Sequence, residues 1–159
     1  MTIYTPQELS TIAEAPMMVG VAVALVDMGL VSTAFEAAAL SQQCRAAAQN
    51  YPNNSIIQSV FSAEALQSGQ IKIEKPTIEP EDMHSGAIVE QAIAAAKAAL
   101  TLLEGKATPP EIQEYKDFLY ACAEAVANAA GSGPFGLSPD KVSEKEAIAL
   151  SKIKTALTF

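Results

Sequence analysis

The amino-acid sequence predicts an all-α protein, a bundle of five or six helices with a long extended crossover in the middle of the chain. Three observations support this prediction: helix starts carry capping boxes, apolar residues recur every three or four positions, and small aliphatic residues dominate the composition. Aromatic residues make up only 6% of the chain and Trp is absent, so the core must come from Ala, Leu, Ile, Val and Met. The 159 residues suit one domain, residues 1–159.

Three helix starts show Ser or Thr followed three residues later by Glu. In this capping box the hydroxyl accepts a hydrogen bond from the backbone N–H of the Glu, and the carboxylate accepts one from the backbone N–H of the cap. In two of the three cases Pro follows the cap directly, where its fixed φ and missing N–H fit the first helical position. The three pairs are Thr5 with Glu8, Thr108 with Glu111, and Ser143 with Glu146.

The first helical stretch is expected from Pro6 to about Met28, with Gly29 as a possible end. Pro16 lies in its interior, where a proline removes one backbone hydrogen bond of the helix. We therefore expect a kink at Pro16, or two short helices in place of one.

Within this stretch the run from Ala15 to Val26 is wholly apolar, but Glu14 and Asp27 bound it at twelve residues. A membrane-spanning helix needs about 20 apolar residues, so the run indicates a buried central helix. Gly20 and Ala24 would let another backbone come close, either inside the bundle or across the two-fold axis of a homodimer. We expect the homodimer, because the run is apolar on nearly every face.

A second helix is expected from Thr33, where Glu36 offers a weaker capping box, to about Asn50. Asn54 is placed to cap a third helix over Ser55 to Ser68, which Gly69 would end. From Gln70 to Pro80 apolar and polar residues alternate and prolines follow, without a second strand that could pair. This segment is the expected crossover.

Three further helices are expected: one from near Pro80 to Glu104, one from Pro109 to Ala130, and a last one from Glu144 to Leu157. Their apolar spacing predicts narrow seams, and the short link from Gly105 to Thr108 predicts that the first two pack as antiparallel neighbours. A Gly- and Pro-rich loop at Gly131 to Pro139 precedes the last helix, with Phe135 and Leu137 folded back onto the bundle. The seams are Ile88, Ala92, Ala95, Ala99 and Leu102 in one helix, and Ile112, Tyr115, Leu119, Cys122, Val126 and Ala129 in the other.

The net charge of -8 disfavours nucleic acid and anionic membranes as partners, because both bind proteins largely through basic residues. The start MTIYTPQEL lacks the basic region and cleavage pattern of a signal peptide, so we expect a cytoplasmic protein.

Cys44 and Cys122 lie in helical patterns without CxxC spacing or a neighbouring His, which predicts buried, reduced and slowly reacting thiols. A bridge between them would need an oxidising compartment.

His84, the only histidine, forms an E-x-x-H spacing with Glu81. Di-iron bundles use this spacing on two helices with further Glu residues, so a single copy predicts a solvated His, with a site shared between subunits as the alternative. Asp27 could act as an acid or base, but it has no His or Cys close in sequence, and an exposed carboxylate is expected.

The segment from Asp140 to Glu146 matches the closing half of a calcium loop, but Phe135, Leu137 and Pro139 stand where the opening ligands should be. The capping box accounts for its Ser and Glu. Nucleophile motifs, P-loops and dinucleotide fingerprints are absent from the sequence. We expect no catalytic residue, no metal ligand and no cofactor.

The C-terminal half resembles small helical bacterial proteins of unknown function and, distantly, the TerB-like domains of tellurite resistance. The resemblance lies in Thr108 to Glu111, Ala121 to Ala127, the Gly-rich loop, and the V-S-x-x-E start at Val142. It implies a helical fold with an acidic surface suited to metal binding, but only Glu144 and Glu146 match there, so no site is transferred.

The sequence thus favours a non-enzymatic interaction or stress-associated protein that acts through its surface, with a protein partner or a second copy. The alternative is a carrier that encloses a small apolar ligand among Met17, Met18 and Met28, since Met adapts to irregular spaces. A carrier needs a cavity of about 300 Å³ or more, whereas an interaction protein needs none.

Overall fold

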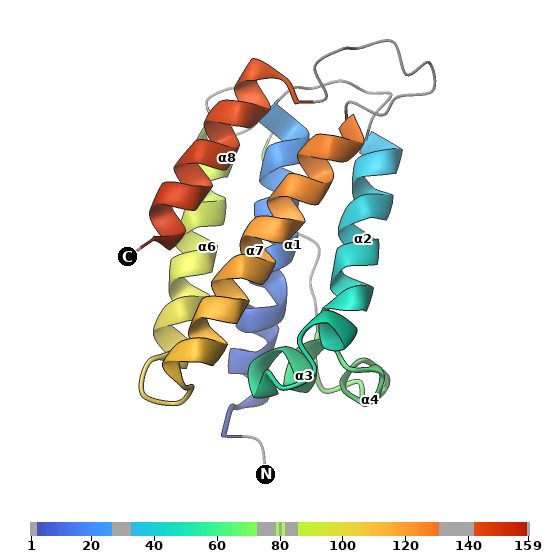
Figure 1. The fold of residues 1–159 in the computed structure, drawn as a ribbon, viewed down its shortest axis with the longest axis vertical. Helices are drawn as coiled ribbons and strands as arrows, with labels where there is room; N and C mark the ends of the chain where they lie inside the picture. The colour runs from blue at the N-terminus through green and yellow to red at the C-terminus, as the bar shows by residue number, and fades with distance from the viewer. Residues whose placement is uncertain are drawn as a thin grey trace.

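The computed structural model describes residues 3–26, 33–72, 79, 81, 86–130 and 142–158. Every regular element among these residues is a helix, which confirms the predicted all-α bundle. Figure 1 shows the long helices side by side, with the short helices α3 and α4 at one end. The helices are α1 (Pro6–Val26), α2 (Thr33–Asn50), α3 (Ser55–Phe61), α4 (Ala63–Gln67), α6 (Ala87–Leu103), α7 (Pro109–Ala130) and α8 (Glu144–Leu157).

Helix α1 is the central element, because α2, α3, α6, α7 and α8 all pack against it (Figure 1). Its side chains Ile12, Val19 and Val23 are completely buried, as expected for the apolar run. Burial of each such side chain stabilises the fold by about 1.5–3 kcal/mol. By length and composition alone the 21-residue helix could also cross a membrane, which the twelve-residue run did not suggest, but buried core helices pass the same test.

Helix α1 continues through Pro16, so the expected division into two short helices is wrong. Pro16 has no N–H to donate to the carbonyl of Ile12, four residues earlier. The hydroxyl of Tyr115 on α7 donates to that buried carbonyl instead, over 2.7 Å. Burial raises the pKa of Tyr115 well above its usual value, so the hydroxyl keeps the proton that it donates. The polar group that proline would leave unpaired is therefore satisfied by a neighbouring helix.

All three predicted capping boxes are present, and α1, α7 and α8 begin where the sequence indicated. In each box the backbone N–H of the cap donates to the Glu carboxylate, and the backbone N–H of the Glu donates to the cap hydroxyl. The first of these distances is 2.8 Å for Thr5 to Glu8, 3.0 Å for Thr108 to Glu111, and 2.8 Å for Ser143 to Glu146. The side chain of Thr33 lies outside the described residues, so the weaker box there stays a prediction.

The single helix expected over Ser55 to Ser68 is wrong, because the chain forms α3 and α4 instead. Ser62 separates them in an extended conformation, with φ -65° and ψ 154°. Its hydroxyl accepts a hydrogen bond from the backbone N–H of Ala65 at 3.2 Å and so caps a new helix. A serine side chain that bonds local backbone in this way competes with continuation of the helix. Gly69, at φ +66°, follows α4 as expected.

Helix α6 begins at Ala87, so the continuous helix predicted from near Pro80 is wrong, although Glu81 is itself helical. Gly86, at φ +71°, precedes it in a left-handed conformation that does not continue a right-handed helix. The described residues of the predicted crossover are not helical, and the rest of it lies outside the described part of the chain; they are Gln70, Ile71, Lys72 and Glu79.

The predicted pairing of α6 with α7 along their seams is also wrong. The two helices contact each other little. Helix α6 packs mainly against α1, and α7 packs about equally against α1 and α2, while both also contact α8. Helix α1 is apolar on nearly every face. Packing against α1 therefore buries more apolar surface of α6 and α7 than packing of their Ala-rich seams against each other would. The seam positions Ile88, Ala92, Ala99, Tyr115, Leu119, Cys122 and Val126 are buried, whereas Ala95, Leu102, Ile112 and Ala129 are half-buried.

Gly20 brings α1 close to α2 inside the chain. A Cβ atom at this position would lie 2.6 Å from Cδ1 of Leu40, so only glycine fits without a shift of that side chain. The close approach expected at Gly20 therefore serves packing within the bundle. A homodimer stays a prediction. Gly20 no longer supports it, because this residue already packs against α2 inside the chain.

Asn54 and Glu111 join the start of α3 to the start of α7. The buried Asn54 accepts from the backbone N–H of Ile57 at 3.0 Å and donates to the carbonyl of Glu111 at 3.0 Å and to the carboxylate of Glu114 at 2.9 Å. The carboxylate of Glu111 accepts from the backbone N–H of Ser55 at 3.0 Å and also closes the Thr108 box. The hydroxyl of Ser55, followed by the Thr108 groups, lowers the pKa of Glu111 to about 2.

We predict that Glu111→Gln weakens the pH dependence of stability in acid. A depressed pKa means that the carboxylate stabilises the fold above its usual pKa of 4.5 and that this contribution is lost as the pH falls towards about 2. Near neutral pH the substitution should cost about 1 kcal/mol, the typical net value of such hydrogen bonds. Urea unfolding between these pH values measures the effect, with Glu124→Gln on the exposed face of α7 as the control. Identical pH profiles for Glu111→Gln and wild type would contradict this assignment.

Candidate functional site

The residues that the sequence singled out for chemistry are not gathered into one site in the described part of the chain. Asp27, His84 and Asp140 lie outside the described residues, and Glu81 is exposed. Glu146 is buried and closes the capping box of α8, as the sequence predicted. Among the described residues no three His, Cys, Asp or Glu side chains are placed to share a metal ion.

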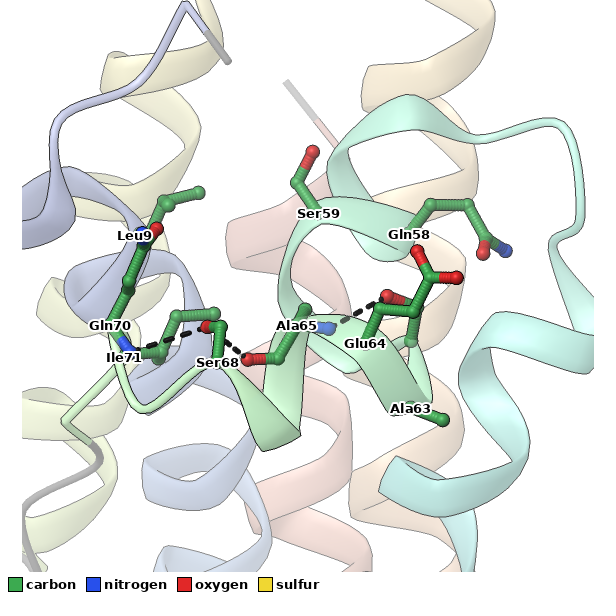
Figure 2. A pocket seen from close by; sticks show the side chains of 10 residues that line it. Leu9, Gln58, Ser59, Ala63, Glu64, Ala65, Ser68, Gln70 and Ile71 are labelled. Atoms are coloured by element: carbon green, nitrogen blue, oxygen red, sulfur yellow. Dashed lines mark hydrogen bonds between the residues drawn. The ribbon is translucent and has the colours of Figure 1, made fainter. Parts of the chain in front are cut away.

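A hollow of about 580 Å³ lies between the start of α1, the helices α3 and α4, and the segment after α4. Figure 2 shows Leu9 and Ile71 on one side of it and Gln58 and Glu64 on the other. The space is open to solvent. Its lining residues are Leu9, Gln58, Ser59, Ser62, Ala63, Glu64, Ala65, Ser68, Gln70 and Ile71.

The two helical walls of the hollow are held with different strength. On the α3 wall, Gln58 donates hydrogen bonds to the carbonyls of Ala48 at 2.6 Å and Tyr51 at 3.1 Å, which ties α3 to the end of α2. Helix α4 has no buried residue. Local bonds stabilise it, such as that from the hydroxyl of Ser68 to the carbonyl of Ala65 at 2.7 Å (Figure 2). An element with so little burial opens at low cost in free energy, so α4 can adjust to an occupant.

The chemistry of this lining suits recognition. Leu9 and Ile71 offer apolar surface, neutral Ser and Gln side chains offer donors and acceptors, and Glu64 is the one charged residue of the described lining. That lining has no His, Cys, Lys or Arg, so it lacks a base paired with a nucleophile. The hollow could not be predicted from the sequence, because it forms only where α3 ends and Ser62 starts a new helix.

Three sulfur atoms gather at a second place, where α1, α2 and α7 meet. Cys44 on α2 donates from its thiol to the thioether of Met17 on α1, with 4.0 Å between the two sulfur atoms. Cys122 on α7 is completely buried, whereas Cys44 is half-buried. The expectation of free thiols is confirmed for both residues, and that of full burial for Cys122 only.

The two cysteines influence each other's acidity. The interaction with Cys122 lowers the pKa of Cys44. The same interaction, with burial, raises the pKa of Cys122. The pair is therefore asymmetric, with the more acidic thiol on the more accessible residue. The interaction of the two thiols could not be predicted from the sequence, because it depends on the packing of α2 on α7.

Glu36 is a further residue whose burial the sequence did not indicate. It lies in the first turn of α2 and is 3% exposed, although only a capping role was predicted for it. No local pattern could have predicted this, because its burial depends on how α2 is rotated against the bundle.

We predict that alkylating reagents label Cys44 before Cys122 in the folded protein. Cys44 is more accessible and more acidic, so its rate should exceed that of Cys122 by about tenfold or more. Peptide mass spectrometry over a time course with iodoacetamide measures both rates, and labelling in urea gives the unfolded reference. Equal, fast labelling of both thiols under native conditions would contradict the described burial.

No family model matches this chain, and neither a curated protein nor a solved structure matches it. The resemblance to TerB-like domains therefore stays a prediction.

Proposed function

We propose that this chain is a non-enzymatic helical protein that acts by binding a partner protein in the hollow between α1, α3 and α4. The observation that carries the proposal is the lining of the hollow, which combines apolar side chains with neutral polar ones and lacks paired catalytic groups. Protein interfaces combine apolar area with hydrogen-bonding groups in this way. The stress-associated role stays part of this proposal and rests on the sequence alone.

The charge of the hollow indicates the kind of partner. Glu64 stands in its wall, and the whole chain carries a net charge of -8. A segment with Lys or Arg beside an apolar side chain would place the charge near Glu64 and the apolar group near Leu9 and Ile71. Opposite charge raises the rate of encounter and selects among partners.

A carrier of a small apolar ligand is the second candidate, because the hollow exceeds the ~300 Å³ that such a ligand needs. Its openness and its polar side chains favour a protein segment over an enclosed ligand. Met17 packs against the core beside Cys44, and neither Met17 nor Met18 is among the residues of the hollow. Native mass spectrometry of the purified chain separates the two candidates, since a carrier would retain a bound small molecule.

We expect a photo-reactive amino acid at Ser59, in the hollow, to cross-link one defined protein in cells of the source organism. The same amino acid at Ala98, on the exposed face of α6, is the matched control and should not. Charge reversal by Glu64→Lys should reduce the cross-link about fivefold, since about 1 kcal/mol of attraction is lost. Glu124→Lys, exposed on α7, should leave it unchanged.

The same products from Ser59 and Ala98, or an unchanged yield with Glu64→Lys, would contradict binding at this hollow. A product with twice the chain mass of 16.6 kDa would identify the partner as a second copy. That result would support surface binding and the predicted homodimer together.

A further inference from the structure

We propose that the segment bound in the hollow is helix α8 of a second copy of this chain. In this contact Ile148 of one copy packs against Leu9 and Ile71 of the other, and Lys145 lies beside Glu64. The inference rests on the proposed function, because it names the partner of the same hollow. It is carried by the charge and the exposed face of α8, which the proposed function does not use.

Helix α8 is the basic helix of an acidic protein. It carries three Lys and two Glu residues, whereas every other described helix has at least as many acidic as basic residues. One of the two acidic residues, Glu146, is buried in the capping box, so the exposed face of α8 is more basic still. Because the whole chain has a net charge of -8, α8 is the described helix that a second copy attracts most.

The exposed face of α8 also carries a large apolar side chain between two Lys residues. Ile148 is 53% exposed, whereas Ile153 on the same helix is buried in the bundle. Lys145 and Lys152, three residues before Ile148 and four after it, are exposed on the same face. Lys152 pairs with Glu90 of α6 at 3.5 Å, so Lys145 is the better placed of the two to meet a partner.

The hollow offers groups that complement this face. Leu9 and Ile71 supply its large apolar side chains, and the exposed Glu64 is the one charged residue of its described lining. Its volume of about 580 Å³ exceeds that of an isoleucine side chain, so Ile148 can enter together with the aliphatic stem of Lys145. Helix α4, which forms one wall, has no buried residue and can adjust to the incoming helix.

The hollow cannot be filled by α8 of the same copy. Within the chain α8 packs against α1, α6 and α7, and it has no contact with α3 or α4. Figure 1 shows α8 on one side of the bundle and α3 and α4 on the other. The contact therefore joins two different surfaces of two copies. Each copy presents both surfaces, so two copies can bind each other reciprocally or successive copies can bind in a row.

A charge exchange between the two surfaces tests the inference by sedimentation velocity on the full chain at up to about 1 mM, where even a weak contact is populated. The wild type should self-associate. Glu64→Lys and Lys145→Glu should each weaken self-association about tenfold, because like charges then face each other. An equimolar mixture of the two variants should associate again, since each altered charge meets its opposite on the other variant. Lys97→Glu, exposed on α6, is the matched control and should behave as the wild type.

A second pair of variants tests the apolar part of the contact. Ile148→Asp should reduce self-association at least as strongly as Lys145→Glu, because it places a carboxylate against the apolar side of the hollow. Its fold should be kept, since the side chain is exposed, and circular dichroism checks this. Ala98→Asp, exposed on α6, adds the same charge elsewhere and should change nothing.

Two results would overturn the inference: a wild type that stays monomeric at the highest concentration, or a mixture that associates no better than each variant alone. The photo-cross-link from Ser59 then decides about the hollow itself. One defined product with another protein would keep the hollow as a binding site and remove α8 as its occupant. The same products from Ser59 and Ala98 would contradict the proposed function as well.

Discussion

The hydrogen bond from the Tyr115 hydroxyl to the Ile12 carbonyl allows a helix with an internal proline to stand at the centre of this bundle. Pro16 cannot donate to that carbonyl, and a buried polar group left unpaired costs about 1–3 kcal/mol. Because α7 supplies the missing donor, α1 continues as one helix of 21 residues. The other long helices depend on this continuity, since each of them packs against α1.

Features set by neighbouring residues could be predicted from the sequence. The capping boxes gave the starts of α1, α7 and α8, and the buried Asn54 caps α3 as expected. Cap bonds close within three residues, so their pattern is visible in the chain itself. Features set by competition or by packing could not be predicted. Ser62 starts a new helix and α6 begins only after Gly86. Helix α6 packs mainly against α1, and α7 packs against α1 and α2.

The same division holds for the candidate sites. Apolar periodicity predicted that Cys122 is buried, but no spacing in the sequence could show that Cys44, on another helix, raises its pKa. The hollow depends on the break at Ser62 and was invisible for that reason. Tyr115 was expected only as an apolar seam residue, and its hydroxyl acquires its role from the missing N–H of Pro16. Proline inside a helix, with a buried tyrosine elsewhere, is the signal that could have suggested this pair.

The most direct test of this account is a double-mutant cycle on the free energy of unfolding with Tyr115→Phe and Pro16→Ala. Tyr115→Phe should cost about 1–3 kcal/mol in the wild type, because the Ile12 carbonyl loses its donor. In the Pro16→Ala background it should cost much less, since the N–H of the new alanine can donate to that carbonyl. An equal cost of Tyr115→Phe in both backgrounds would contradict the link between the proline and the tyrosine.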